Sequence, residues 1–459
     1  MKLSFNGADR TVTGSCHMVE AAGKHILIDC GLYQGGRELE EENDHPFGFD
    51  PAAIDFVLLT HAHLDHCGRL PLLAKKGFHG EIISTAATAE LARIVMVDSA
   101  HLQEEDARFR AKKAKKHGNK PQTVAPLYSL IDALNSISRF GRTVQYGQPV
   151  ELAPGLSATF VNAGHILGSA SVFLQHAGEP SVLFSGDLGK ASDSLLIAPI
   201  NPPHADNVVM ETTYGNRNHK PLGPSIDEFY TAVSDTFIRG GNVVVPTFAL
   251  ERAQELLYII HNGIDANRLP PQTQVYVDSP MAISVTEVME RNLGDLQPAI
   301  AERVAAGHDP FQFDGLHLTR DQAASVAINA IPKGAIIMAG SGMCTGGRVR
   351  HHLVQNLSRA ESSVVFVGFA AVGTLARNIV DGAKEVRIFG ERVPVRARIH
   401  TINGFSAHAD QQELLAWHSQ VGAGRTFLVH GEESVMTGFS ALLGNSKVEM
   451  PQLHQAYEL

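Results

Sequence analysis

The stretch that most constrains this chain is THAHLDH at residues 60–66, which follows the apolar run FVLL at residues 56–59. Three imidazoles and one carboxylate lie between His61 and His66. Neutral imidazole suits zinc, and a carboxylate oxygen can hold a second ion or orient a water molecule. A loop after a buried strand can turn His61 and His63 towards one metal, and Asp65 and His66 towards its neighbour. A polar turn that is histidine-rich by chance is the alternative, and the density of ligand groups favours a metal site.

The HAHLDH segment resembles the His-x-His-x-Asp-His motif of the metallo-β-lactamase fold. That resemblance implies a hydrolase with two zinc ions at the edge of an αββα sandwich, and it requires further ligands downstream. His165 lies in NAGHILG and Asp187 lies in FSGDLG, each just past an expected strand. Alone, a histidine or aspartate at a strand end is more often a turn residue. Together, these two residues match the third and fourth motifs of that fold.

Length and composition indicate a soluble globular protein of about two domains. Of the 459 residues, 44% are hydrophobic and 19% are charged, which excludes a mostly disordered chain. The start of the chain lacks the apolar core of a signal peptide and no later run reaches membrane-spanning length, so we expect a cytoplasmic protein with no membrane partner. The four cysteines form no C-x-x-C pair, as expected in a reducing compartment. The net charge of −10 restricts any contact with nucleic acid to a local patch.

Asp29 ends an apolar strand beside Gly31. A carboxylate in this place can accept a hydrogen bond from a ligand imidazole and so fix its tautomer. A capping or turn aspartate is the alternative. Because an aspartate at the end of such a strand is the first motif of the resembled fold, we favour the supporting role behind the metal ligands.

The sequence pattern changes after the Pro-rich segment 198–203. Strands and helices then alternate, which predicts a doubly wound parallel sheet. One helix is expected to begin at a capping box formed by Ser225 and Glu228. The expected fold class is α/β, an αββα metallo-β-lactamase sandwich with an inserted doubly wound α/β domain. We expect the first part of the sandwich at residues 1–207, the inserted domain at 208–390 and the last part of the sandwich at 391–459.

Three further segments resemble motifs A, B and C of the β-CASP nucleases. They are METTYG with Glu211, GFSAHAD with His408 and TFLVHGE with His430. With them, the resemblance covers nearly the whole chain, with seven motifs in the family's order. It implies two zinc ions per chain, one held by His61, His63 and His165, the other by Asp65, His66 and His430, with Asp187 between them.

The resemblance also implies a mechanism and a substrate. The two ions would share a hydroxide that attacks phosphorus, with Asp65 in the catalytic set. His408 would donate a proton to the leaving 3′ oxygen while Glu211 holds the imidazolium. In this family a histidine at motif C goes with RNA, so His430 favours an RNA substrate. The chain therefore looks like a minimal zinc-dependent endoribonuclease that leaves 5′-phosphate and 3′-hydroxyl ends.

Two basic or glycine-rich segments are candidates for contact with RNA. In the loop GSGMCTGGR at residues 340–348, Ser341 and Gly342 could cradle a phosphate, with Arg348 and Arg350 adding charge. A tight structural turn is nearly as well supported. The lysines of residues 112–116 could form a weaker outer contact, although such a run is usually a solvated helix face.

Three alternatives to an endoribonuclease stay open. A small-molecule metallo-hydrolase would share HAHLDH but would not need Glu211, His408 or an inserted domain. A catalytically silent RNA-binding subunit should have lost ligands, and none is lost here. A 5′ exoribonuclease of the same family would use the same metal chemistry, and a homodimer is a further open expectation.

Overall fold

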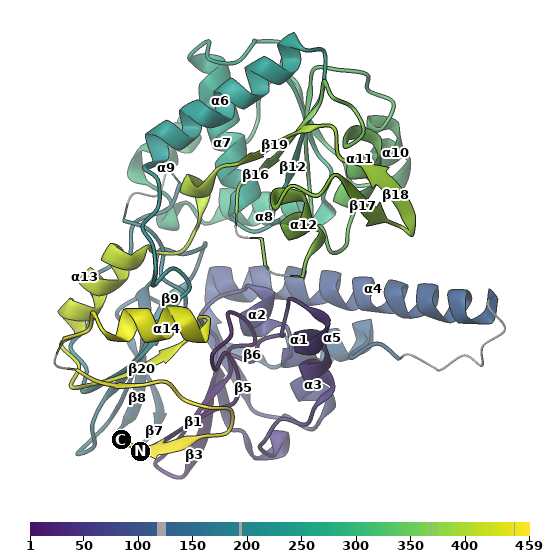
Figure 1. The fold of residues 1–459 in the computed structure, drawn as a ribbon. Helices are drawn as coiled ribbons and strands as arrows, with labels where there is room; N and C mark the ends of the chain where they lie inside the picture. The colour runs from purple at the N-terminus through teal and green to yellow at the C-terminus, as the bar shows by residue number, and fades with distance from the viewer. Residues whose placement is uncertain (117–124, 192–194, 369, 372, 445) are drawn as a thin grey trace.

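The computed structural model describes residues 1–116, 125–191, 195–368, 370–371, 373–444 and 446–459. The chain forms two lobes joined along one side, with both termini in the lower lobe (Figure 1). The lower lobe contains two seven-stranded sheets, and the upper lobe contains a six-stranded sheet. The expected αββα sandwich with an inserted α/β domain is thereby confirmed.

The first sandwich sheet has the order β22-β1-β2-β3-β4-β5-β6. Its strands are β1 (Lys2–Phe5), β2 (His17–Ala21), β3 (Lys24–Ile28), β4 (Phe56–Leu58), β5 (Glu81–Thr85), β6 (Phe140–Val144) and β22 (Ala456–Glu458). The last strand of the chain pairs antiparallel with the first, Lys2 opposite Glu458. The helices that follow its strands are α1 (Arg37–Glu41), α2 (Leu64–Cys67), α3 (Leu70–Lys75), α4 (Ala86–Lys116) and α5 (Leu130–Ile137), with the 3-10 turns η1 (Glu42–Asp44) and η2 (Pro51–Ala53).

The second sandwich sheet has the order β21-β20-β11-β10-β9-β8-β7. Its strands are β7 (Pro149–Ala153), β8 (Leu156–Asn162), β9 (Ala170–His176), β10 (Val182–Phe184), β11 (Asn207–Glu211), β20 (Arg425–Val429) and β21 (Lys447–Glu449), and its helices are α13 (Gln411–Val421) and α14 (Glu433–Ser440). Strand β8 alternates buried and half-buried residues along its length. The buried residues of both sheets, including Phe5, Phe160 and Phe427, meet in one apolar layer. This layer holds the two sheets face to face.

The inserted domain is built on a parallel sheet of order β14-β13-β15-β12-β16-β19. Its strands are β12 (Val243–Pro246), β13 (Gln274–Val277), β14 (Leu316–Leu318), β15 (Ala335–Ala339), β16 (Ser363–Phe366) and β19 (Arg398–Thr401), beside the hairpin of β17 (Glu385–Ile388) and β18 (Glu391–Pro394). Its helices are α6 (Leu222–Ile238), α7 (Arg252–Asp265), α8 (Pro280–Arg291), α9 (Pro298–Ala305), α10 (Gln322–Ile328), α11 (Val349–Asn356) and α12 (Leu375–Val380), with 3-10 turns η3 (Leu293–Asp295) and η4 (Asn403–Phe405). Strands β12 and β15 are wholly buried, as expected for a parallel sheet covered on both faces.

Near both expected boundaries, strand pairing assigns strands to a different domain from the one that the sequence predicts. Strand β11 pairs with β10 and β20 in the sandwich, although it begins at the expected boundary near residue 207. Strand β19 pairs with β16 in the inserted sheet, although it lies beyond residue 390. The reason is that β11 and β19 are short strands whose local sequence suits either sheet, so only the pairing partner assigns each to a domain.

Helix α6 begins earlier than the sequence predicts. The capping box at Ser225 is wrong, because α6 begins at Leu222 and the buried Ser225 hydroxyl donates to the Pro221 carbonyl inside the helix. Helix α4 continues to Lys116 over 31 residues, so the basic run lies on a helix that crosses beneath the upper lobe (Figure 1). Among the described residues, no helix is both long and apolar enough to traverse a bilayer.

Gly31 allows the backbone after β3 to lie directly against the backbone of Asp65, in the loop of residues 60–66. A Cβ at Gly31 would lie 1.6 Å from the Asp65 carbonyl oxygen. We therefore expect Gly31→Ala to lower the free energy of unfolding by about 2 kcal/mol or more, because backbone must move. Gly223→Ala is the matched control: it lies in α6 with open space around the new methyl, and it should raise stability by up to about 1 kcal/mol. Denaturant melts of both variants test this, and equal stabilities would contradict it.

Candidate metal centre

The strand directions of the sandwich bring the candidate ligands to one edge. In the second sheet, β10, β11 and β20 run parallel, and Asp187, Glu211 and His430 lie at or just past their carboxyl ends. In the first sheet, β3 and β4 run parallel, and they are followed by Asp29 and His61. Carboxyl ends of parallel strands share one edge of a sheet, which is where ligands bind in such folds.

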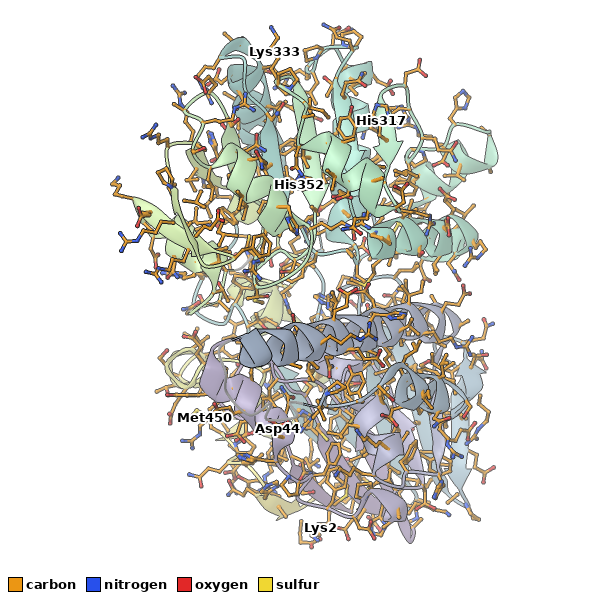
Figure 2. The ribbon with its side chains drawn as sticks, turned by 90° about the vertical axis from the view of Figure 1, so that its right-hand side faces the viewer. Lys2, Asp44, His317, Lys333, His352 and Met450 are labelled. Carbon is orange, nitrogen blue, oxygen red and sulfur yellow. The ribbon has the colours of Figure 1, made fainter. Side chains whose placement is uncertain are left out.

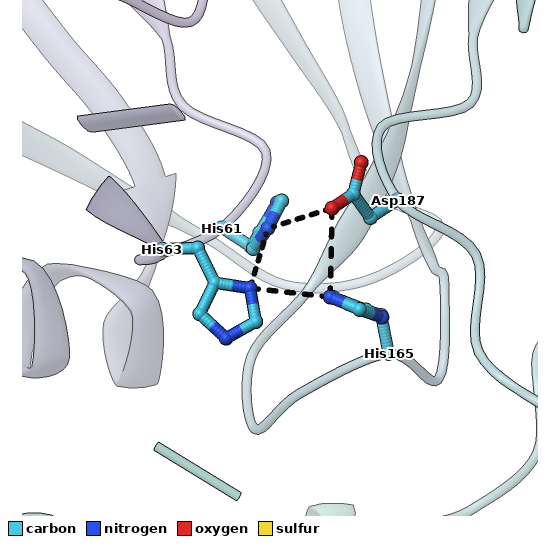
Figure 3. A group of neighbouring side chains, drawn as sticks. All are labelled: His61, His63, His165 and Asp187. Atoms are coloured by element: carbon cyan, nitrogen blue, oxygen red, sulfur yellow. Dashed lines mark hydrogen bonds and ion pairs between the residues drawn. The ribbon is translucent and has the colours of Figure 1, made fainter. Parts of the chain in front are cut away.

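The first ligand cluster consists of His61, His63, His165 and Asp187 (Figure 3). His63 Nδ1 lies 3.2 Å from His61 Nε2 and 3.2 Å from His165 Nε2. Asp187 Oδ2 lies 3.5 Å from each of the same two Nε2 atoms. Donors about 2.0–2.1 Å from a tetrahedral zinc ion would be about 3.3 Å apart. The spacing of the four donor atoms therefore fits a zinc ion.

Burial keeps the imidazoles of the first cluster neutral. It lowers the pKa of His61 to about 3 and the pKa of His63 to about 4. It also lowers the pKa of His165 well below its ordinary value. Each ring therefore carries a lone pair at neutral pH that it can donate to a cation.

The second ligand cluster consists of Asp65, His66 and His430. His430 Nε2 lies 3.4 Å from Asp65 Oδ2, and His66 Nε2 lies 3.3 Å from Asp187 Oδ1. Asp187 thus presents one carboxylate oxygen to each cluster. Among the residues that the structure describes, the buried atoms His66 Nε2, His430 Nε2 and Asp187 Oδ1 have no hydrogen-bond partner. Because buried polar atoms normally have partners, these residues fit a further cation between them.

Asp29 orients a ligand of each cluster through one oxygen. Asp29 Oδ2 lies 2.7 Å from His66 Nδ1, which donates to it, and accepts a second hydrogen bond from the Thr60 hydroxyl at 2.7 Å. The Thr60 oxygen in turn lies 3.0 Å from His61 Nδ1. Both rings then direct Nε2 towards the centre. These contacts fit the supporting role expected for Asp29, which stays a prediction. Thr60 was not expected in the site, and its only sequence signal is that it directly precedes His61.

Thr213 supports His430 in a similar way. Its hydroxyl lies 3.0 Å from His430 Nδ1, and the His430 N–H donates to the Ala8 carbonyl at 2.8 Å. His430 has a φ of +50°, a conformation that non-glycine residues rarely adopt and that clusters at functional sites. Thr213 was also missed, and its signal was its place two residues after Glu211.

Glu211 and His408 form a pair beside the first cluster. His408 Nδ1 lies 3.2 Å from Glu211 Oε2 and 3.9 Å from Asp187 Oδ2. Burial lowers the pKa of His408, but the carboxylates of Glu211 and Asp187 outweigh it and raise that pKa to about 9. The Leu188 N–H donates to Glu211 Oε1 at 2.6 Å and so fixes the carboxylate. The pair can hold a proton at the edge of the metal ligands.

The expected RNA contacts lie in the upper lobe, where Figure 2 labels the neighbouring His352. Arg348 donates from Nη1 to Asp278 Oδ1 at 2.7 Å and from Nη2 to the Arg320 carbonyl at 2.7 Å. The guanidinium of Arg350 lies over the Phe389 ring, 4.3 Å from its centroid. These contacts favour an anchoring role for both arginines, and their contact with phosphate stays a prediction.

The glycine-rich loop itself is closely packed. Ser341 Oγ lies 3.4 Å from Thr345 Oγ1, and a Cβ at Gly342 would lie 2.7 Å from the Phe248 ring. Such packing favours the tight-turn alternative over a phosphate cradle. The lysine side chains of residues 112–116 lie outside the part of the chain that the structure describes.

Three family models match the chain in succession. The metallo-beta-lactamase superfamily matches residues 9–228, the Beta-Casp domain matches 253–379, and the Zn-dependent metallo-hydrolase RNA specificity domain matches 392–451. Ribonuclease TTHA0252 of Thermus thermophilus is 40% identical over 96% of this chain and 96% of its own length. The chain belongs to the β-CASP family of the metallo-β-lactamase superfamily. It therefore carries the parts of a metal-dependent ribonuclease, as the sequence resemblance implied.

Other relatives extend the comparison. The RNase J-like protein of Methanocaldococcus jannaschii is 30% identical over 95% of this chain and 94% of its own length. The transcription termination factor FttA of Methanothermobacter thermautotrophicus is 31% identical over 94% of this chain and 67% of its own length. A solved protein of unknown function from Enterococcus faecalis aligns with a TM-score of 0.57 at 12% identity, covering 100% of this chain and 99% of that one. That last likeness shows the fold alone.

His430 and His408 have different predicted roles, metal ligand and proton donor. We expect His430→Ala to lose the metal of the second cluster, because it removes a donor atom aimed at that cluster. His408→Ala should keep the full metal content and lose turnover by about 10² to 10⁴. Elemental analysis of both purified variants, beside a turnover assay, checks this. Equal metal loss in the two variants would show that the roles are wrongly assigned.

The contacts of Arg348 allow a direct test of its role. Arg348→Ala removes hydrogen bonds to Asp278 and to two backbone carbonyls, so we expect a lower melting temperature. RNA affinity should keep its dependence on salt, because the guanidinium is already engaged. A true phosphate contact would instead reduce the slope of log K against log salt by about 0.7. A smaller slope of log K against log salt, with an unchanged melting temperature, would instead support a contact between Arg348 and phosphate.

Proposed function

We propose that the protein is a zinc-dependent endoribonuclease that hydrolyses RNA phosphodiester bonds and leaves 5′-phosphate and 3′-hydroxyl ends. The RNA specificity domain at residues 392–451 supports RNA as the substrate. The relative from Thermus thermophilus is named a ribonuclease and matches nearly end to end. We further propose that two zinc ions bind per chain, because the ligands fall into two clusters that share Asp187.

The observation that carries the proposal is the pair of His408 and Glu211 beside Asp187. A nuclease must protonate the leaving 3′ oxygen, and a histidine held by a carboxylate next to the metal ligands can supply that proton. Hydrolysis of a small ester or lactam would not require this pair. The pair therefore favours a phosphodiesterase over a small-molecule metallo-hydrolase.

Each residue of the site then has a defined task. Zinc ions, when bound, supply Lewis acidity and lower the pKa of a coordinated water. The two clusters hold the ions, and Asp65 orients the attacking water as well as binding metal. Glu211 keeps His408 protonated and aimed, since its own position is fixed by the Leu188 N–H. Ser341, Gly342, Arg348 and Arg350 of the upper lobe stay predicted contacts of the substrate backbone.

An RNA of defined sequence, labelled at the 5′ end in one sample and at the 3′ end in another, tests the proposal. We expect internal fragments from both labels, which an endonuclease produces. New fragments should accept a ligation that needs a 5′-phosphate, and His408→Ala should yield none while keeping its metal.

The outcomes separate the alternatives. Mononucleotides released from the 5′ end would identify a 5′ exoribonuclease of the same family. Binding of RNA without cleavage, in a sample with full metal content, would indicate a silent RNA-binding subunit. Cleavage that leaves a 5′-hydroxyl would contradict the proposed attack.

A further inference from the structure

The loop that carries His165 is held by two carboxylates of the inserted domain. This loop follows β8 and comprises residues 163–169. The Leu167 N–H donates to Glu251 Oε2 at 3.4 Å, and the Gly168 N–H donates to Asp295 Oδ2 at 3.1 Å. Glu251 precedes α7 and Asp295 ends η3, so both belong to the upper lobe.

The other N–H groups of the loop bond locally. Ala163 donates to the Ser169 carbonyl, and Ser169 donates to the Ile166 carbonyl. The Ser169 hydroxyl oxygen accepts from the N–H of His165 at 2.9 Å and from that of Ile166 at 3.2 Å. Of the described residues 163–169, only Leu167 and Gly168 therefore donate a backbone N–H to the inserted domain.

A second contact joins the same parts of the two lobes. Leu196 and Leu296 form an antiparallel bridge, flanked by the Ile197 N–H to the Asp295 carbonyl at 3.1 Å and the Gln297 N–H to the Leu195 carbonyl at 2.9 Å. The chain then returns to the loop, since the Ile200 N–H donates to the Asn162 carbonyl at 3.1 Å. Segment 195–200 thus lies between η3 and the His165 loop.

The loop has little freedom on its other side. The Gly168 carbonyl accepts from the hydroxyls of Thr85 and Thr88, each at 2.8 Å. Gly168 has a φ of +78°, and a Cβ there would lie 2.6 Å from the Thr88 nitrogen. The first sheet therefore fixes one face of the loop, and the inserted domain fixes the other.

We propose that Glu251 and Asp295 are positioning residues through which the inserted domain holds His165 in line with the first ligand cluster. This inference rests on the proposed role of His165 as a metal ligand. Metal affinity at the first cluster then depends on the contact between the lobes, and by linkage the metal strengthens that contact. The loop of His430, by contrast, is held by the sandwich through the Ala8 carbonyl.

The test uses Asp295→Ala in the full zinc-loaded chain, with two comparisons. Asp295→Asn keeps an oxygen that can accept from Gly168. Asp321→Ala is the matched control, because Asp321 also accepts a backbone N–H, that of Ala324 at 2.8 Å, but within the inserted domain at α10. Each sample is held against a graded series of a zinc chelator, and zinc retention and the melting curve are recorded.

We expect Asp295→Ala to lower the zinc affinity of the first cluster by about 10- to 100-fold, as removal of a supporting partner does. Asp295→Asn and Asp321→Ala should retain wild-type affinity. Hydrogen exchange of peptides covering residues 163–169 should accelerate in Asp295→Ala but not in Asp295→Asn or Asp321→Ala. Glu251→Ala should show the same losses and serves as the second variant if Asp295→Ala fails to fold.

Two results would overturn the inference. One is wild-type zinc affinity in folded Asp295→Ala or Glu251→Ala, even with a lower melting temperature, since that describes a merely structural contact. The other is an equal loss of affinity in Asp321→Ala. Neither readout uses RNA, so a protein that failed to cleave RNA would leave this inference standing, and failure of this inference would leave the proposed ribonuclease intact.

Discussion

The convergence of ligand atoms in a buried space is the constraint on which this structure depends. In the first cluster, three imidazole nitrogens and one carboxylate oxygen lie 3.2 to 3.5 Å apart, so one bound cation could satisfy all four atoms at once. Desolvated groups of this kind are costly unless they are paired or coordinate a metal. Because the donors come from loops of both sheets, metal binding and the closure of the sandwich are coupled.

The inserted domain does not disturb this arrangement, because the chain leaves the sandwich after β11 and re-enters it at β20, which pairs with β11. Strand β11 ends at Glu211, and β20 pairs beside it in parallel with Glu211 opposite Val429. His430 therefore comes next to Glu211 and Thr213 although more than two hundred residues separate them. The antiparallel bridge of His408 with Gly189 brings the His408 side chain to the same edge. The parallel pairing of β11 with β20 therefore brings together residues that lie far apart in the sequence.

The candidate metal ligands could be predicted from short sequence patterns. The HAHLDH stretch, His165, Asp187 and His430 each follow a buried strand, and the structure brings them together. The sequence could not predict Thr60, Thr213, Glu251 or Asp295, because a hydroxyl or carboxylate that supports a ligand looks like any other polar residue until its partner is known. The expected capping box at Ser225 failed for a related reason: its hydroxyl is buried inside α6, where tertiary packing overrides the local signal. Arg348 was predicted to contact phosphate because it follows a glycine-rich turn. The sequence did not indicate that its guanidinium donates to Asp278 instead.

The most direct test of the central claim is the position of the metal itself. Anomalous scattering from crystals of the zinc-loaded protein, recorded on both sides of the zinc absorption edge, locates each ion without reference to activity. The account predicts two peaks about 3.5–4 Å apart, one among His61, His63 and His165, and one among Asp65, His66 and His430, with an Asp187 oxygen towards each. A single peak, or a peak outside these ligands, in crystals that hold zinc at full occupancy would contradict it.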